Sequence, residues 1–335
     1  MKLIVDCFGG DKGPAACVEG VLEAAETYPG AEFVLVGDED RLRAELPDGC
    51  KNIEIIHAPD AVSGNDKPID AIRLKPESSM VKAVRALRED KTADGLISVG
   101  PTGVLIAAAT LRIGRIDGVR RPAFCPILPT MNGGIVGICD SGANVECTPE
   151  MLLQFAVMGS EYLKAAFQRK EPRVALLNVG TEEEKGDDLH RDAYRLLKQE
   201  AAVNFVGNME SRDLLSGKYD LVVCDGFSGN VLVKSTEGTA VELMKKIKKD
   251  IYSKGLYKIG ALFMKKMFEE EKRFMNYQNY GGSVLLGTEK IIIKGHGSSD
   301  ATAVRRCIEQ AADMLGSDLN EKIAARLNTK EEAYV

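Results

Sequence analysis

Short apolar runs alternate with longer stretches of helical periodicity along most of this chain. The runs include Leu3–Val5, Phe33–Val36 and Ile53–Ile56, while residues 14–28 and 78–90 show apolar residues at helical spacing. Alternating strands and helices favour a mainly parallel sheet that helices cover on both faces. Strands in such a sheet are buried on both faces, which requires continuous apolar runs of this kind. The sequence therefore predicts an α/β protein.

Glycine-containing loops follow several of the predicted strands. These loops contain, in chain order, Gly9, Gly10, Gly100, Gly103, Gly180, Gly226 and Gly229. In open α/β sheets, ligands bind outside the carboxyl ends of the strands. Glycine at such a position lets backbone N–H groups approach an anion closely. Each loop alone is equally well explained as a tight turn, but the whole set favours an anionic ligand with several phosphate-like contacts.

Composition and missing motifs exclude several classes of protein. The net charge of −6 and the pI near 5.4 argue against a globally basic nucleic-acid-binding protein. The eight cysteines form no CxxC pair, which argues against zinc-ribbon and thioredoxin-like sites and favours buried thiols in a reducing compartment. With three histidines in the chain, we expect no metal site. The chain also lacks GxSxG and GxxxxGK[ST] patterns, so serine-hydrolase and P-loop functions have no support.

The beginning of the chain favours a cytoplasmic location. Residues 1–6 already have the pattern of a strand, and no apolar run approaches the roughly 20 residues of a membrane span.

Short loop motifs occur in a fixed order from residue 1 to about residue 315. They include Asp6–Asp11 (D-C-F-G-G-D), Ser98–Gly103 (S-V-G-P-T-G), Asp140–Asn144 (D-S-G-A-N), Asn178–Gly186, Asp225–Asn230 and Lys294–Asp300 (K-G-H-G-S-S-D). In order and spacing they resemble the acyl-ACP:phosphate acyltransferase (PlsX) family. Two positions differ from that family's pattern. Pro101 stands where the family has asparagine, and residues 132–137 lack its usual aspartate and lysine.

The resemblance implies a three-layer α/β/α fold with a mainly parallel mixed sheet, like that of the isocitrate and isopropylmalate dehydrogenases and phosphate acetyltransferases. Residues 1–335 would form a single unit of two intertwined subdomains, working as a homodimer. The implied reaction moves a fatty acyl group from acyl carrier protein to inorganic phosphate, without metal or other cofactor. A downstream glycerol-phosphate acyltransferase would use the acyl-phosphate for phospholipid synthesis.

The chemistry of this reaction makes modest demands on the side chains. A thioester is already activated and phosphate is already a nucleophile, so positioning can supply roughly 7–11 kcal/mol. A preorganised donor to the oxyanion supplies roughly 3–4 kcal/mol more. We expect the phosphate and substrate site to comprise Asp6, Gly9, Gly10, Asp11, Ser98, Gly100, Thr102, Gly103, Asp225, Gly226, Gly229, Asn230, Ser299 and Asp300. The four aspartates are expected to orient loops, since a carboxylate beside phosphate repels it.

Three further residues are candidates for catalysis. Lys185 would neutralise phosphate or the oxyanion, with a solvated surface lysine as the alternative. His296 would donate to the thioester oxygen or protonate the departing thiolate, unless it only caps the following helix. Asn178 is a neutral donor suited to direct substrate contact.

A basic amphipathic stretch stands out in this acidic chain, within a predicted helical excursion at about 240–277. Residues 245–266 hold eight lysines and one acid, Asp250, and Gly255 and Gly260 interrupt the helical pattern. The predicted membrane-contact residues are Leu256, Tyr257, Ile259, Leu262 and Phe263. Three interpretations stay open: a dimer helix with a solvated lysine face, a peripheral membrane contact, and a docking surface for acidic acyl carrier protein.

Alternatives to the main functional prediction remain. The donor could be acyl-CoA, which the sequence does not distinguish from acyl carrier protein. An NAD- and metal-dependent hydroxyacid dehydrogenase would need clustered aspartates and an adenosine-binding loop, and neither is evident. A catalytically inactive scaffold that recruits partners to the membrane is kept open by Pro101 and the 132–137 loop.

Overall fold

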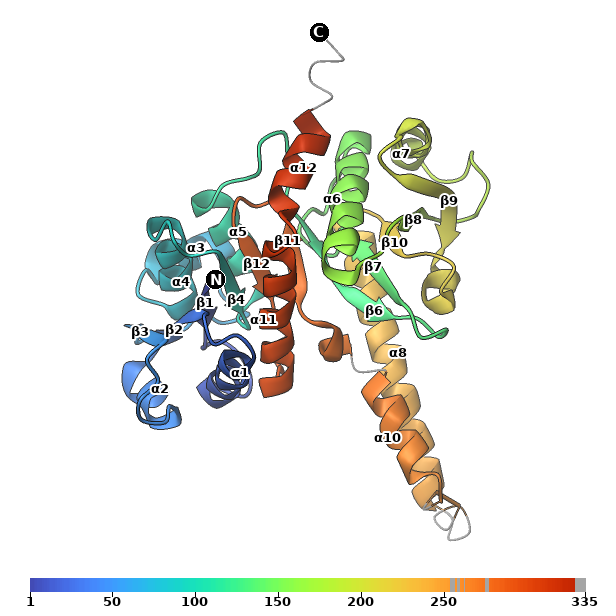
Figure 1. Cartoon of the computed structure of the whole chain (residues 1–335). Coiled ribbons are helices and arrows are strands. Elements are labelled where there is room, and N and C mark those ends of the chain that lie inside the picture. The colour runs from blue at the N-terminus through green and yellow to red at the C-terminus, as the bar shows by residue number, and fades with distance from the viewer. Residues whose placement is uncertain (254–256, 258–259, 262, 275–276, 329–335) are drawn as a thin grey trace.

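The strands form two mainly parallel sheets in the computed structural model, which describes residues 1–253, 257, 260–261, 263–274 and 277–328 (Figure 1). The seven-stranded sheet has the order β3-β2-β1-β4-β12-β11-β5, and the five-stranded sheet has the order β6-β7-β10-β8-β9. The first sheet comprises β1 (Lys2–Asp6), β2 (Glu32–Gly37), β3 (Ile53–His57), β4 (Gly95–Ser98), β5 (Ala123–Cys125), β11 (Ser283–Leu286) and β12 (Ile291–Lys294). The second comprises β6 (Ile127–Pro129), β7 (Ile135–Cys139), β8 (Arg173–Asn178), β9 (Asn204–Glu210) and β10 (Leu221–Val223).

Helices cover both faces of the sheets. They are α1 (Pro14–Thr27), α2 (Glu39–Glu45), α3 (Pro68–Leu74), α4 (Ser79–Glu89), α5 (Thr102–Arg112), α6 (Pro149–Phe167), α7 (Asp188–Gln199), α8 (Gly226–Ser253), α10 (Lys265–Phe274), α11 (Ala301–Leu315) and α12 (Leu319–Asn328), with 3-10 turns η1 (Ser211–Ser216) and η2 (Tyr277–Tyr280). Alternate residues of β1 enter different cores: Leu3 and Val5 lie in a core shared with α1, α6 and α11, and Ile4 lies in one shared with α3–α5. This arrangement confirms the predicted three-layer α/β/α architecture.

The passage of the chain from one sheet to the other is a feature that the apolar runs did not predict. β5 belongs to the seven-stranded sheet and β6 to the five-stranded sheet, and only Pro126 separates them. Proline has no backbone N–H and therefore cannot continue a hydrogen-bonded ladder on its donor side. Its carbonyl instead accepts from Ile138 of β7 at 3.1 Å. The two sheets consequently meet around this residue.

A glycine contact fixes where α11 begins. A Cβ atom on Gly20 of α1 would lie 2.6 Å from the carbonyl oxygen of Ala301 and 2.7 Å from Cβ of Val304. Only glycine permits this approach of α1 to the first turn of α11. The first turn of α11 is part of the candidate site described below.

Helix α8 starts at Gly226 and runs without interruption into the predicted excursion at about 240–277. α8 and α10 both reach beyond the body of the molecule (Figure 1). Of the predicted membrane contacts, Leu256, Ile259 and Leu262 lie outside the described residues, whereas Tyr257 and Phe263 are 49% and 85% exposed. No helix within the described ranges is long and apolar enough to cross a membrane. The proposed division into two intertwined subdomains stays a prediction.

Candidate functional site

Three functional candidates lie in register at the carboxyl ends of adjacent parallel strands. Asp6 at the end of β1 pairs with Ser98 at the end of β4, and Ser98 pairs with Lys294 at the end of β12. The carboxyl ends of parallel strands meet at one edge of the sheet, which is where ligands bind in α/β folds. The loops that follow these strands are therefore neighbours.

The Asp6 carboxylate organises this edge from within the protein. It is fully buried, accepts a 2.7 Å hydrogen bond from Ser98 Oγ, and lies 3.4 Å from the N–H of Phe8. Ser98 Oγ in turn accepts from the N–H of Gly100 at 3.1 Å. Burial raises the pKa of Asp6 to about 6, although these hydrogen bonds oppose the shift. Asp6, Ser98 and the Gly100 amide are thus engaged with one another, in agreement with a loop-orienting role for Asp6.

The glycine loops pack closely against each other. A Cβ on Gly9 would lie 3.1 Å from Cα of Gly100, and one on Gly10 would lie 3.2 Å from the carbonyl oxygen of Gly297. The N–H of Asp11 donates to that same carbonyl at 2.7 Å. These residues hold the loops after β1, β4 and β12 together, and Gly103 is exposed on the first turn of α5.

The start of α8 rests on the loop that follows β7. The N–H of Gly226 donates to the carbonyl of Asn144 at 2.7 Å, and Asp225 Oδ1 accepts from the N–H of Ser228 at 2.9 Å. A Cβ on Gly229 would lie only 1.9 Å from the carbonyl oxygen of Asp140, so this contact requires glycine. The result is a fixed position for Asn230 on the next turn.

A cleft of about 120 Å³ collects residues from both sheets. From the seven-stranded side come Thr102, Lys294, His296 and Ser299, and from the other side come Ser141, Asn230 and Lys234. Phe124, Ile127 and Val233 supply apolar walls. The structure therefore brings together four of the predicted site residues, Thr102, Asn230, His296 and Ser299, from three separate segments: α5, α8 and the loop between β12 and α11.

The electrostatics of the cleft combine lysine with neutral hydrogen-bond donors. Burial lowers the pKa of Lys294 to about 8, against the opposing influence of Cys307, Asp6 and Asp11. His296 is at the mouth of the cleft, and partial loss of hydration together with Lys234 and Lys294 lowers its pKa. Its Nδ1 lies 2.8 Å from Ser298 Oγ and accepts from the N–H of Ser298 at 3.2 Å, and on the second contact we assign the proton of the neutral ring to Nε2.

The loop just before α11 contributes a buried hydroxyl to the cleft. Ser299 Oγ lines the cleft, is buried, and has no hydrogen-bond partner among the described residues. A buried hydroxyl without a partner is costly unless a ligand or water satisfies it. Asp300 caps the helix by accepting from the N–H of Ala303 at 3.0 Å and lies 3.8 Å from Lys12 Nζ. Its loop-orienting role stays a prediction.

The other two catalytic candidates lie on a different loop, after β8. Asn178 Nδ2 donates to the carbonyl of Lys185 at 3.0 Å, and Asn178 Oδ1 accepts from the N–H of Val179 at 2.8 Å. Asn208 braces the same loop by donating to the carbonyl of Glu182 at 2.7 Å. The Lys185 side chain is exposed, and neither Lys185 nor Asn178 lines the cleft. Their catalytic roles stay predictions.

The two departures from the family pattern also have defined positions. Pro101 immediately precedes α5 with φ −64°, a value natural for proline, so it begins the helix without strain. In the 132–137 loop, Asn132 Oδ1 accepts from Thr130 Oγ1 at 2.7 Å and from the N–H of Gly134 at 3.2 Å. That loop does not line the cleft.

Sequence reasoning missed the two cleft lysines. Lys294 ends an apolar strand and begins the K-G-H-G-S-S-D motif, so its position at a strand's carboxyl end was an available signal. Lys234 lies four residues after Asn230, and that spacing puts both side chains on one face of α8.

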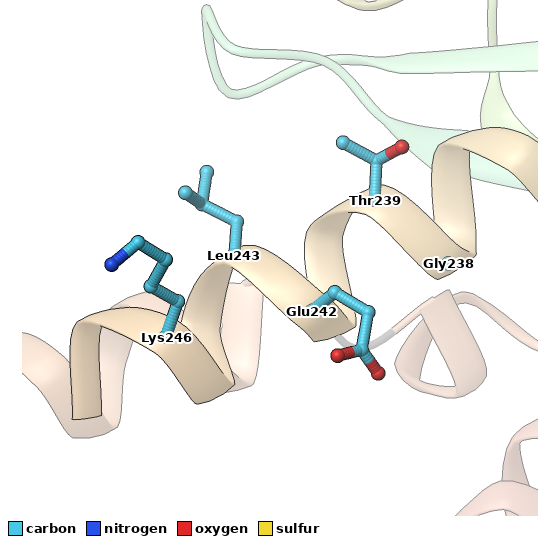
Figure 2. A pocket seen from close by; sticks show the side chains of 5 residues that line it. All are labelled: Gly238, Thr239, Glu242, Leu243 and Lys246. Atoms are coloured by element: carbon cyan, nitrogen blue, oxygen red, sulfur yellow. The ribbon is translucent and has the colours of Figure 1, made fainter. Parts of the chain in front are cut away.

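A second, larger depression lies on α8, distant in sequence from most of these groups. This depression is open to solvent and has a volume of about 510 Å³. It is lined by Gly238, Thr239, Glu242, Leu243 and Lys246. Figure 2 shows Thr239 and Leu243 projecting from one side of the helix and Glu242 from the other. It contains none of the predicted catalytic residues.

Known proteins resemble this chain over nearly its whole length. Residues 1–322 match the family model described as "Fatty acid synthesis protein". Phosphate acyltransferases from Shouchella clausii and Clostridium acetobutylicum are 42% and 43% identical over 332 and 330 residues. These matches cover 99% and 98% of this chain and 100% and 99% of the relatives.

Solved structures with the same fold include two acyl-transferring enzymes. A phosphotransacetylase from Streptococcus pyogenes matches with a TM-score of 0.58 and 17% identity, covering 93% of each chain. A branched-chain phosphotransacylase from Enterococcus faecalis V583 matches with a TM-score of 0.56 and 14% identity, covering 94% of this chain and 100% of the other. At such low identity these likenesses establish the shared fold.

The raised pKa of Asp6 predicts a specific dependence of stability on pH. Between about pH 4 and pH 6 the folded protein binds a proton at Asp6 that the unfolded chain has released, so stability falls as pH rises through this range. Relative to Asp6→Asn, the wild type should lose about 3 kcal/mol of unfolding free energy across it. Urea unfolding of both proteins at several pH values measures this difference. Parallel pH profiles would contradict it.

Proposed function

Because the chain belongs to the acyl-ACP:phosphate acyltransferase (PlsX) family, we propose that it transfers a fatty acyl group from acyl carrier protein to inorganic phosphate. The product, acyl-phosphate, serves phospholipid synthesis through a downstream glycerol-phosphate acyltransferase. The observation that carries this proposal is the cleft between the sheets. There Lys294 and Lys234 lie with the neutral donors Asn230, His296 and Ser299, a set suited to phosphate beside a polarised carbonyl.

Different residues of the cleft bind the phosphate and the thioester. Phosphate binds at the N-terminal end of α11, where the buried hydroxyl of Ser299, just before the helix, and the first helix N–H groups favour an anion. Asn230 approaches it from α8. The neutral ring of His296 donates from Nε2 to the thioester oxygen as that oxygen becomes negative. Attack by a phosphate oxygen forms the new C–O bond, and the C–S bond then breaks.

Acyl carrier protein is the favoured donor because the projecting helices carry many lysines. The described part of this region includes Lys245, Lys246, Lys248, Lys249, Lys265 and Lys266. At least four of these pair with acids one turn away, such as Lys245 with Glu242 at 2.8 Å. Exposed pairs of this kind are worth only about 0.3–0.5 kcal/mol, so an acidic protein partner can displace them.

The same projection supports a peripheral membrane contact. Tyr252, Tyr257 and Phe263 are exposed near its end, close in sequence to several lysines. Apolar and aromatic side chains enter the lipid interface while lysines attract anionic headgroups. We place the protein in the cytoplasm, in peripheral association with the membrane.

A homodimer is the proposed assembly, with α8 as its contact. Val231, Val241 and Leu243 of α8 are 49%, 50% and 56% exposed, and Leu243 borders the open depression of Figure 2. Exposed apolar residues along one helix favour burial against a second copy. A monomeric mass in sedimentation at micromolar protein concentration would contradict this assembly.

Purified protein should form acyl-phosphate when palmitoyl-ACP and phosphate are supplied together. The product is measured as hydroxamate after reaction with hydroxylamine, and omission of phosphate is the control. Palmitoyl-CoA supplied at the same concentration should give a lower kcat/KM, since it lacks the acidic protein surface. A higher value with CoA would favour the alternative donor. No product with either donor would favour the inactive scaffold.

The Lys185→Ala variant tests the cation predicted on the loop after β8. If Lys185 neutralises phosphate or the oxyanion, kcat/KM should fall about 10²-fold or more, as on loss of one oxyanion donor. Lys198→Ala is a suitable control, because Lys198 pairs with Glu183 of the same loop from helix α7 at 2.7 Å. Turnover that is unchanged in Lys185→Ala would remove this residue from the mechanism.

Flotation with liposomes tests the membrane contact. The wild type should float with vesicles containing anionic phosphatidylglycerol and remain at the bottom with purely zwitterionic vesicles. Phe263→Ser should reduce flotation several-fold by removing an exposed apolar side chain. Phe227→Ser, which alters an exposed phenylalanine at the other end of α8, is the matched control. Absence of wild-type binding to anionic vesicles would reject the membrane contact.

A further inference from the structure

Breaking a thioester releases a thiolate, so the reaction of the proposed function needs a proton donor that converts this thiolate to a thiol. The pantetheine sulfur of the donor is an alkyl thiol with a pKa of about 8.5, taking cysteine as a guide. A thiolate leaving into a partly enclosed site is a poor leaving group unless a nearby acid protonates it. The candidate acids are the titratable groups that line the cleft.

His296 is poorly suited to give up a proton. Its pKa is lowered, so the ring is neutral at pH 7, and its Nδ1 already accepts from the N–H of Ser298. A neutral imidazole is a good hydrogen-bond donor but a very weak acid, as in enzymes that use neutral histidine to polarise a carbonyl. His296 can therefore stabilise the oxyanion without supplying the proton.

Lys234 is also poorly suited to be the proton donor. Its side chain is 57% exposed and forms an ion pair with Glu237 at 3.0 Å on the same face of α8. Its ammonium group therefore faces Glu237 and solvent rather than the interior of the cleft. Lys234 is better suited to attract an anion to the cleft than to exchange protons within it.

Lys294 has the surroundings that proton exchange requires. It ends β12 in register with Ser98, lines the cleft, and its Nζ donates to the carbonyl of Gly295. Charged and titratable groups surround it on several elements. They are Asp6 at the end of β1, Asp11 on the loop after β1, Lys234 and Glu237 on α8, His296 on the loop after β12 and Cys307 on α11. Burial outweighs the carboxylates and brings its pKa to about 8, close to that of the thiol.

We propose that Lys294 is the general acid of thioester cleavage. A phosphate oxygen bonds to the acyl carbon, the C–S bond breaks, and the electron pair left on sulfur takes a proton from the Lys294 ammonium group. The products are acyl-phosphate, the free thiol and a neutral amine, which regains its proton from water. In the reverse direction the neutral amine accepts the thiol proton and generates the attacking thiolate.

The nature of the leaving group gives the sharpest test. Lys294→Met keeps the length of the side chain but removes the acid, and it should slow palmitoyl-ACP turnover about 10²–10⁴-fold. With a nitrothiophenyl palmitate donor, whose aryl thiolate leaves without protonation, the same variant should lose less than about tenfold. Lys294→Arg keeps the charge but holds its proton, so it should be as slow as Lys294→Met with palmitoyl-ACP. Recovery of activity in Lys294→Arg, or equal losses with both donors, would overturn the proposal.

Controls separate this role from folding and from the proposed function itself. Lys290→Met, just before the same strand, removes a lysine that donates to the carbonyl of Ala93 at 2.6 Å outside the cleft, and it should show no dependence on the leaving group. If Lys294→Met does not fold, the pH dependence of wild-type kcat provides the test. The value of kcat should fall above about pH 8 with palmitoyl-ACP but not with the aryl donor. A fall with both donors would refute the role of Lys294. A wild type that is inactive with every donor would refute the proposed function instead.

Discussion

The buried hydrogen bond between Asp6 and Ser98 is the constraint on which the candidate site depends. Ser98 Oγ donates to the Asp6 carboxylate at 2.7 Å, which joins the carboxyl ends of β1 and β4. The same Oγ accepts from the N–H of Gly100. A buried carboxylate must be paired or hydrogen-bonded to be tolerated, so these strand ends cannot separate without leaving it unsatisfied. The loops after β1, β4 and β12 then pack so closely that glycine is needed at their contacts. The cleft borders this rigid assembly, which explains how side chains from separate segments keep fixed positions around a small ligand.

The opposite wall of the cleft is built on a different principle. There the first turn of α8 sits directly on the backbone of the loop after β7, because Gly229 allows an approach that any Cβ would block. This contact fixes the part of α8 from which Asn230 and Lys234 line the cleft. One wall is therefore fixed by a buried polar network and the other by close backbone packing. Both give the preorganisation that a reaction with little covalent chemistry requires of its enzyme.

The sequence predicted β1, β2, β3, α1 and α4, because buried parallel strands leave continuous apolar runs and the helices keep their own period. It also placed Thr102, Asn230, His296 and Ser299 in one site, since all follow strands whose ends were expected to converge. It did not predict that Ser98 would donate to Asp6 and accept from Gly100, because such pairing depends on register. It likewise missed the passage between sheets at Pro126, where a single residue separates two strands that the pattern cannot assign to different sheets.

The charge of Asp6 also matters for Lys294, although the two lie two strands apart. A lysine that is buried without any compensation loses its proton well below neutral pH, and it could then not act as an acid. A carboxylate in hydrogen-bonding contact would have the opposite effect and hold the proton too firmly to release it. Cys307 and Asp6 raise the pKa of Lys294 against burial, Asp6 from a distance with Ser98 and the backbone between them, and Asp11 adds to this effect. The balance between burial and remote negative charge brings the amine close to the pKa of the thiol with which it must exchange a proton. The same carboxylate that orders the strand ends therefore also adjusts the acid that the reaction needs.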